Sequence, residues 1–177
     1  MKKAGLILMA LVLGLTGCSA PQPAPKDFNI IFKYGVGAKN ELDTFAGTYT
    51  RDMIGPPFFI TVDLVLSKEE LNKIYNKMVD IVFFGYPDKF SVPVPPGGSV
   101  TTITPYVSYY FKVTSGTGVK ELRWDDEIKN QNDQAAKLRE LIKVIRDIIE
   151  SKPEYKKLPN PTSAYAYLDK SGEVFVI

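Results

Sequence analysis

The chain of 177 residues contains no histidine and only one cysteine. Histidine is the commonest general base and the commonest metal ligand in proteins, so both roles are removed at once. Ser-His-Asp triads, Cys-His pairs and histidine-ligated zinc sites are therefore excluded. A lone cysteine also has no partner for a disulfide bond within the chain.

Other enzyme signatures are missing as well. The sequence has no Ser-x-x-Lys pair, no Gly-x-Ser-x-Gly motif and no Gly-Lys dipeptide of a phosphate-binding loop. The acidic cluster Asp125-Asp126-Glu127 offers carboxylate oxygens that suit calcium, but the alternating ligands and central glycine of an EF-hand loop are absent. We interpret this cluster as a solvated approach to a helix. We predict no catalytic residue, no metal site and no cofactor, and expect that the protein is not an enzyme.

The first residues combine a basic start with an apolar run. Met1-Lys2-Lys3 is followed by uncharged residues up to Leu15, and then by Thr16-Gly17-Cys18. A basic start, roughly 7–15 apolar residues and small residues before a break are typical of a secretory signal peptide. The run is too short for a transmembrane helix, which needs about 20 apolar residues.

The order Leu15-Thr16-Gly17-Cys18 resembles the lipobox of bacterial lipoproteins. This resemblance implies that a diacylglyceryl group is attached to the Cys18 sulfur and that cleavage removes residues 1–17 as the signal peptide. Two acyl chains hold a protein stably on a membrane, whereas one chain binds only marginally. We therefore expect Cys18 to be the lipidation site and the protein's membrane tether. The rest of the chain resembles small envelope lipoproteins of unassigned function, and no residue role follows from that likeness.

Alternating prolines follow the cysteine, and they predict an extended tether over residues 18–26. At about 3.1 Å per residue, this tether would hold a single domain of residues 27–177 about 25 Å from the bilayer. We expect the protein to face the extracytoplasmic side of a bacterial cell membrane or outer membrane. The type of envelope stays open, although Ser19 in place of an aspartate permits outer-membrane sorting in a Gram-negative cell.

The expected mature chain has no net charge. Removing Lys2 and Lys3 leaves 20 basic residues, against 20 acidic residues. Nucleic-acid binding requires a positive surface, so we expect no nucleic-acid partner. We expect a monomer.

Period-two alternation predicts strands over 28–34, 44–51 and 58–66, a hairpin over 106–125 and a second hairpin over 164–177. The turn Gly35-Val36-Gly37 lacks the third glycine of a dinucleotide-binding motif, so we interpret it as a link between strands. On the second strand we expect Phe45 and Tyr49 to share one face, and on the third we expect Phe58 to face inward.

Two segments have helical periodicity. Ser67-Lys68-Glu69-Glu70 is a capping box, and apolar residues recur after it at helical spacing up to Val82. A second helix is predicted from about Asp133 to Ser151, with Pro153 preventing its continuation. Strands grouped before and between two helices predict an α+β fold, with a mainly antiparallel β-sheet packed against two amphipathic helices.

The segment from Gly85 to Thr104 has no periodicity and is rich in proline and glycine. Loops longer than about 12–15 residues are usually functional or disordered. We hypothesise that Tyr86, Phe90, Tyr106 and Tyr110, in or beside this loop, form a contact surface for a partner, since tyrosine provides large contact area at low entropic cost. The alternative is that these rings cover the sheet.

The sequence therefore favours a non-enzymatic, lipid-anchored module that binds an envelope protein or polymer. An envelope enzyme that uses carboxylates and tyrosines on a glycan or peptide is the second hypothesis. A purely structural role in the envelope is the third.

Overall fold

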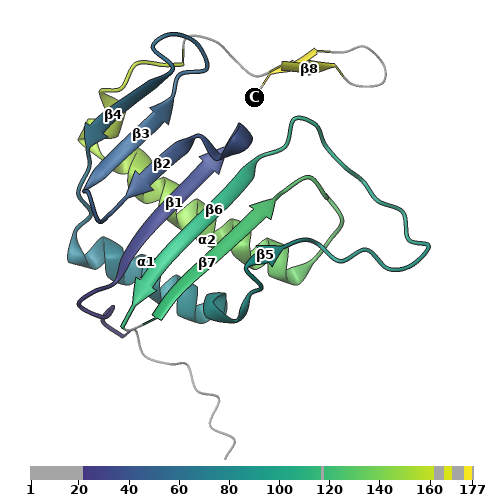
Figure 1. Cartoon of the computed structure of the whole chain (residues 1–177), viewed down its shortest axis with the longest axis horizontal. Helices are drawn as coiled ribbons and strands as arrows, with labels where there is room; N and C mark the ends of the chain where they lie inside the picture. Colours follow the sequence, from purple (N-terminus) through teal and green to yellow (C-terminus); the bar gives the residue numbers. More distant parts are fainter. Residues whose placement is uncertain (1–21, 117, 162–165, 169–173, 177) are drawn as a thin grey trace, which may run out of the picture.

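The computed structural model describes residues 22–116 and 118–161, together with the backbone of residues 166–168 and 174–176. The expected signal peptide, Cys18 and the first part of the tether lie outside these residues. Seven strands form one sheet, in the order β4-β3-β2-β1-β6-β7-β5 (Figure 1). Every pair is antiparallel except β5–β7, which is parallel. The strands are β1 (Asn29–Gly35), β2 (Asn40–Asp43), β3 (Thr48–Asp52), β4 (Phe59–Asp63), β5 (Lys89–Phe90), β6 (Ser108–Ser115) and β7 (Gly118–Asp125).

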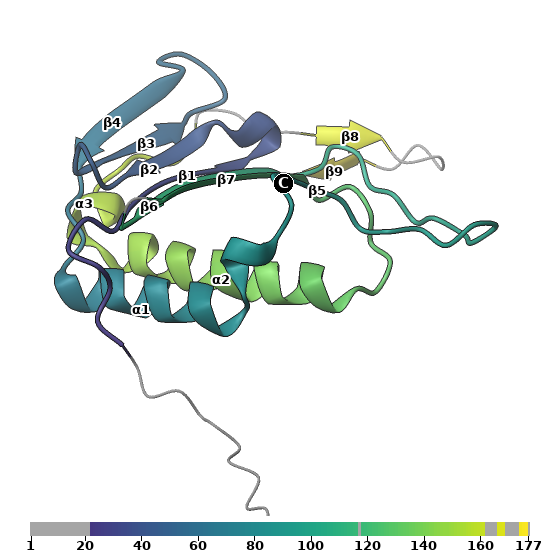
Figure 2. The ribbon, with the colours of Figure 1, turned by 60° about the horizontal axis from the view of Figure 1, so that its bottom comes forward.

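Two helices cover one face of this sheet, as Figure 2 shows. They are α1 (Lys68–Asp80) and α2 (Asp133–Ser151), and the short helix α3 (Pro153–Lys156) follows α2. The core lies between this face and the two helices, and no helix of the described residues covers the other face. The predicted α+β class, with a mainly antiparallel sheet against two helices, is confirmed.

The alternation of β1 is the one that the sequence predicts. Phe28, Ile30, Phe32 and Tyr34 are all buried and face the helices. The strand lies between β2 and β6, near the middle of the sheet. A 3₁₀ turn (Val36–Ala38) links β1 to β2, which confirms that the glycine-containing segment connects two strands.

The capping box at the start of α1 is also confirmed. Ser67 Oγ accepts a hydrogen bond from the Glu70 amide, and the Glu70 carboxylate accepts one from the Ser67 amide. The predicted apolar stripe is wrong at its end, where Val79 and Val82 are exposed and Ile81 is buried instead. Val82 leaves the stripe because the helix ends at Asp80 and Val82 takes a left-handed conformation, with φ of 58°, so the helical period no longer applies to it. Val79 is still helical and lies at the solvent-facing edge of the stripe.

The predicted strand over 44–51 is wrong in its first half. The Asp43 carboxylate accepts hydrogen bonds from the backbone amides of Phe45 and Ala46, and so it stabilises a turn there. Phe45 is consequently exposed, whereas Tyr49 is buried as expected. Phe58 is also exposed, because it precedes β4 at the edge of the sheet.

The second helix agrees closely with its prediction. Leu138, Leu141, Ile142, Ile145, Ile148 and Ile149 are all buried. The Asn132 side chain caps the helix by accepting a hydrogen bond from the Ala135 amide. At the end of the chain, β8 (Ala166–Leu168) pairs with β9 (Val174–Val176) in a separate antiparallel sheet, which confirms the predicted second hairpin.

The last residues of the expected tether lie on α1. The Gln22 amide donates to Asn76 Oδ1 at 2.9 Å, and Asn76 Nδ2 donates to the Gln22 carbonyl at 2.9 Å. The Ala24 amide donates to Asn72 Oδ1 at 2.8 Å. The expected free spacer of 25 Å is therefore too long, because its last part belongs to the folded domain. Among the described residues, no helix is both long and apolar enough to cross a bilayer.

Candidate functional site

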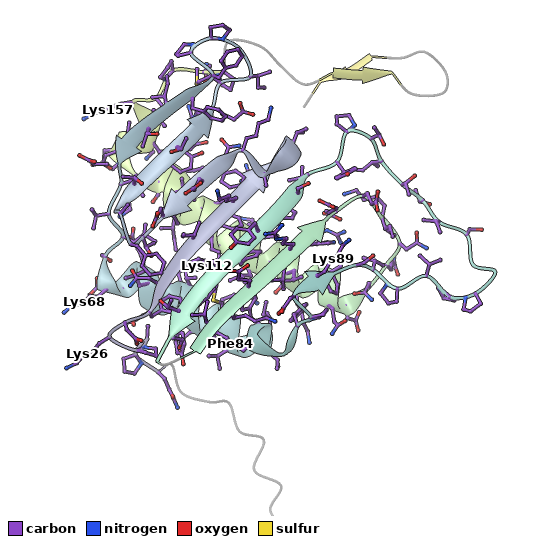
Figure 3. The ribbon with its side chains drawn as sticks, in the orientation of Figure 1. Lys26, Lys68, Phe84, Lys89, Lys112 and Lys157 are labelled. Atoms are coloured by element: carbon purple, nitrogen blue, oxygen red, sulfur yellow. The ribbon has the colours of Figure 1, made fainter. Side chains whose placement is uncertain are left out.

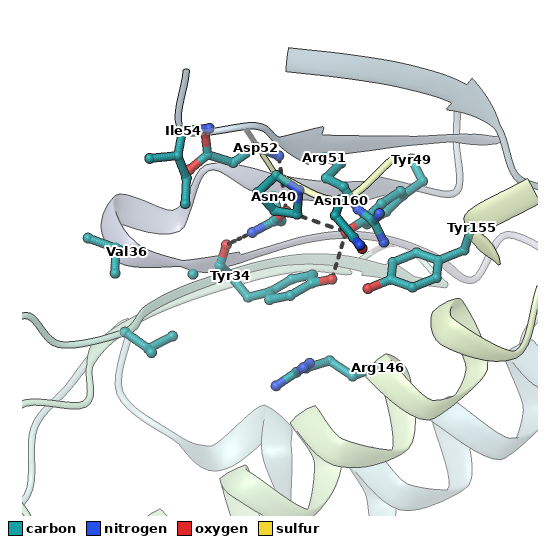
Figure 4. Close-up of a pocket in the computed structure, with 13 residues that line it drawn as sticks. Tyr34, Val36, Asn40, Tyr49, Arg51, Asp52, Ile54, Arg146, Tyr155 and Asn160 are labelled. Carbon is teal, nitrogen blue, oxygen red and sulfur yellow. Dashed lines mark hydrogen bonds between the residues drawn. The ribbon is translucent and has the colours of Figure 1, made fainter. Parts of the chain in front are cut away.

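A pocket of about 400 Å³ lies at the end of the sheet where β1 finishes (Figure 4). Strands β1 and β3, helix α2 and the segment around α3 each contribute polar groups to it. The described residues that line it are Tyr34, Gly35, Val36, Asn40, Tyr49, Arg51, Asp52, Ile54, Val107, Arg146, Tyr155, Asn160 and Pro161. We take it as the candidate site because several of its polar side chains are buried and held by hydrogen bonds.

Two tyrosines and an asparagine form a chain of hydrogen bonds along one side of the pocket. The hydroxyl oxygens of Tyr34 and Tyr49 lie 2.8 Å apart, and the Tyr49 hydroxyl donates to Asn40 Oδ1 at 3.4 Å. Because Tyr49 uses its proton toward Asn40, Tyr34 is the donor to Tyr49. Both phenols are thus fixed in position.

The Asn40 side chain, at the end of these hydrogen bonds, also connects the backbones of β1 and β3. Its amide nitrogen donates to the Tyr34 carbonyl at 3.2 Å, and its oxygen accepts from the Asp52 amide at 3.1 Å. Gly35 makes this approach feasible: it has φ of 102°, and a Cβ there would lie 2.7 Å from Asn40 Nδ2. Glycine at position 35 therefore leaves the space that the Asn40 side chain occupies in the pocket.

Arg51 supplies a buried positive charge, with only 8% of the residue exposed. Its Nη1 donates to the Pro159 carbonyl at 2.9 Å and, more weakly, to the Leu158 carbonyl at 3.4 Å. The guanidinium lies 4.2 Å from the centre of the Tyr155 ring. In the described part of the chain, no carboxylate forms an ion pair with Arg51.

A second guanidinium reaches the pocket from α2. Arg146 lies 5.4 Å from the centre of the Tyr34 ring, and its Nη2 pairs with Glu150 at 2.9 Å. Figure 4 shows Arg146 on the helix side of the pocket, opposite the strands. The two arginines differ in that Arg146 already has a carboxylate partner.

The phenols of the pocket stay protonated at neutral pH. Burial raises the pKa of Tyr49 to about 12, although the hydrogen bonds with Tyr34 and Arg51 lower it. Burial and the neighbouring Tyr49 raise the pKa of Tyr34 well above its usual value of about 10. Both tyrosines can therefore donate hydrogen bonds but cannot act as bases near pH 7.

The rim of the pocket contains a strained residue. Ile54 has φ of 65°, which is rare for a β-branched side chain. The Asp52 carboxylate holds this conformation by accepting a hydrogen bond from the Ile54 amide at 3.0 Å. Such strain is often found at binding sites and is stabilised by the surrounding structure.

The structure contradicts part of the predicted contact surface. Tyr86 and Phe90 are buried, with 4% of each exposed, and their rings pack 5.4 Å apart. Phe90 also packs 5.4 Å from Trp124, because β5 pairs with β7 and so carries the loop back onto the sheet. The hypothesis that these two rings are exposed anchors is wrong: they belong to the core.

The other two predicted residues are half-buried. Tyr110 lies on the sheet face opposite the helices, 5.2 Å from the Arg123 guanidinium, and lines a wide hollow of about 740 Å³. Tyr106 precedes β6 and is not among the described residues that line either hollow. The structure therefore does not bring Tyr106 and Tyr110 together with Tyr86 and Phe90 in one surface.

The acidic cluster after Trp124 differs from its prediction at Asp126, whereas Asp125 and Glu127 are exposed as expected. Asp126 is buried and forms two hydrogen bonds with Arg139, at 2.6 Å and 3.0 Å. It is a structural ion pair and not part of a solvated approach. The described residues contain no group of three or more acidic, cysteine or histidine side chains placed to hold a metal ion.

Sequence reasoning missed Arg51 as a site residue. The signal was present, because Tyr49 and Arg51 lie on the same face of the predicted strand, which places a charged residue where an apolar one is usual.

No protein-family model matches the chain, and a comparison with curated proteins also gives no match.

Proposed function

We propose that the protein is a lipid-anchored, extracytoplasmic binding module whose pocket holds a carboxylate group of an envelope ligand. The anchor is supported by the order of basic start, apolar run, small residues and Cys18. The ligand chemistry is supported by one observation above all: the buried guanidinium of Arg51 faces the pocket without a carboxylate partner among the described residues.

A buried charge is costly unless it is paired and hydrogen-bonded. Two backbone carbonyls and the Tyr155 ring compensate Arg51 in part. A ligand carboxylate would complete this compensation, since carboxylates match the planar fork of a guanidinium. Asn160 lies beside Arg51 in Figure 4 and offers an amide for neighbouring hydroxyl or amide groups of the ligand.

The same groups support binding more than catalysis. The phenols have raised pKa values, and arginine stays charged at all relevant pH values. Asp52 is the one carboxylate of the described lining, whereas glycoside hydrolysis commonly uses two. An envelope enzyme stays the alternative, and turnover of a bound glycan or peptide would favour it.

The anchor is tested by changing its acylated residue. Cys18→Ala should leave the precursor unacylated and uncleaved at this site, because acylation precedes cleavage in bacterial lipoproteins. Globomycin, which inhibits the lipoprotein signal peptidase, should make the wild type accumulate as a precursor. Processing of Cys18→Ala to a membrane-bound product of mature size would contradict the anchor.

The ligand class is tested with small probes on the full chain in detergent micelles. We expect D-glucuronate or N-acetyl-D-alanine to shift NMR signals of pocket residues, whereas neutral D-glucose should not. The two acids distinguish a sugar carboxylate from a peptide carboxylate. As a control, Asn160→Trp should block the pocket with little loss of stability, because Asn160 is exposed. Equal shifts with glucose and glucuronate, or full binding by Asn160→Trp, would contradict the proposal.

A further inference from the structure

Exposed apolar side chains gather at one end of the domain. Among the described residues, nine large apolar side chains are exposed, and six of them belong to the β2–β3 turn, the segment just after β4, the end of α1 with the segment after it, and the start of β7. Figure 1 shows these segments at the end of the sheet where β1 begins. These six, which we call the proximal surface, are Phe45, Val65, Val79, Val82, Phe84 and Val119. Single exposed apolar residues are ordinary, but a concentration of them on one side usually marks an interaction surface.

The strand register shows that Phe45, Val65 and Val119 lie at the end of the sheet where β1 begins. Asn29, at the start of β1, lies opposite Thr114, next to the β6–β7 turn and Val119. Ile31 lies opposite Asp43, Asp43 opposite Thr48, and Thr48 opposite Asp63. The β2–β3 turn with Phe45 and the end of β4 with Val65 therefore lie on the same side as the start of β1.

The members from α1 and the segment after it continue this surface. Phe84 and Val119 line a common hollow of about 390 Å³ with Tyr75 of α1. The Tyr75 ring lies 6.5 Å from Phe84 and 5.2 Å from Phe28, the residue just before β1. Figure 3 shows Phe84 and Lys26 along the same lower edge of the molecule.

The lipid anchor holds the end of the domain with the proximal surface close to the membrane. Gln22 is fixed to α1 by its two hydrogen bonds with Asn76, and only residues 19–21 separate it from Cys18. A chain extends at most about 3.6 Å per residue, so the acylated sulfur is held within about 15 Å of Gln22. Gln22 is bound to Asn76 of α1, three residues before Val79 of the proximal surface, so the anchor holds this side of the domain close to the bilayer.

The charged residues near the proximal surface do not form a patch of one sign that would attract an oppositely charged partner. Lys26 and Asp27 are both exposed, and the Asp27 carboxylate accepts a hydrogen bond from the Gly116 amide. Asp80, at the end of α1, pairs with Lys77 at 3.0 Å. Charges of both signs are present, so the apolar side chains define the surface.

We infer that the proximal surface rests on the lipid bilayer and places its apolar side chains among the headgroups and upper acyl chains. This inference rests on the lipid anchor of the proposed function and is independent of the ligand. The pocket lies at the opposite end of β1, about 20 Å away for a strand of this length. The domain would thus present its pocket away from the membrane.

Two phenylalanines provide a matched pair of positions for testing the contact. Phe45 on the proximal surface and Phe59 at the opposite end of the sheet have nearly equal exposure, 50% and 52%. Cys18 is the chain's only cysteine and its sulfur is acylated, so Phe45→Cys and Phe59→Cys each introduce one reactive thiol. Each thiol is labelled with the environment-sensitive fluorophore NBD on the full lipidated protein.

The labelled proteins are bound to vesicles of phosphatidylethanolamine and phosphatidylglycerol that contain a nitroxide lipid. We expect the label at position 45 to emit at shorter wavelength and to be quenched several-fold more than the label at position 59. Water-like emission at both positions, or stronger quenching at position 59, would overturn the contact. Failure of the protein to sediment with the vesicles would instead overturn the anchor, and the contact with it.

Discussion

The hydroxyl groups of Tyr34 and Tyr49 lie 2.8 Å apart, although β2 separates their strands in the sheet. Tyr34 is paired with Asn40 of β2 and Tyr49 is paired with Leu42 of β2, so the two tyrosine side chains meet across this strand. This contact fixes one side of the pocket and connects it to the stability of the domain.

Alkaline pH should destabilise the domain through these two phenols. Their folded-state pKa values are raised above the unfolded value of about 10, so folding binds the phenolic protons more tightly. Their stabilising contribution is complete below about pH 10 and is lost as pH rises through the folded-state pKa, which is about 12 for Tyr49. The loss amounts to as much as about 1.4 kcal/mol per pH unit for each tyrosine.

Urea unfolding of the wild type and of Tyr34→Phe between pH 8 and pH 12 measures this effect. The variant should show a smaller decline in unfolding free energy above pH 10, because it has one phenol fewer to deprotonate. Identical declines would mean that Tyr34 does not contribute to the alkaline transition.

Ile145→Ala should lower the unfolding free energy by about 2–5 kcal/mol as a cavity mutation. Ile145 is fully buried in the middle of the α2 stripe, between helix and sheet. Lys143→Ala, on the same helix, is the matched surface control and should change stability by less than about 0.5 kcal/mol. Chemical denaturation measures both, and similar small losses would contradict the packing of α2.

Phe90→Ala should lower the melting temperature, because Phe90 packs between Tyr86 and Trp124. Removal of a buried phenylalanine ring costs about 3–5 kcal/mol, which corresponds to several degrees in a domain of this size. Tyr110→Ala should lower the melting temperature much less, because Tyr110 is half-buried on the sheet face opposite the helices. An unchanged melting temperature for Phe90→Ala would show that the ring is not part of the core.

Val82→Gly should raise the unfolding free energy by about 1 kcal/mol. Val82 has φ of 58°, a conformation that costs an L-residue roughly 1–2 kcal/mol and that glycine adopts freely. The side chain is exposed, so its removal leaves no cavity. Val119→Gly, at another exposed valine, is the control and should not stabilise. A destabilised Val82→Gly would mean that the valine makes contacts that offset its strain.

Residues with clear periodicity were predictable from the sequence. The alternation of β1, the capping box of α1 and the stripe of α2 each follow from local patterns whose partners are near in the chain. The same patterns also predict the α+β fold class.

Features that depend on distant partners were not predictable. The Gly85–Thr104 segment has no period, and only its parallel pairing with β7 reveals that Phe90 is buried. The proline-rich tether has an extended composition, but Asn72 and Asn76 bind its end to α1. The pocket joins Arg51 of β3 to the carbonyls of Leu158 and Pro159, more than 100 positions away.

The most direct measurement compares the affinity of D-glucuronate for the wild type, Arg51→Lys and Arg123→Lys by titration calorimetry. Lysine keeps the charge but loses the planar fork, so Arg51→Lys should weaken binding about tenfold, the equivalent of about 1.4 kcal/mol. Arg123 lies on the sheet face opposite the helices, outside the pocket, and Arg123→Lys should bind as the wild type does. Circular dichroism checks that both variants are folded. Equal affinity in all three folded proteins, or no binding by the wild type, would contradict carboxylate recognition by Arg51.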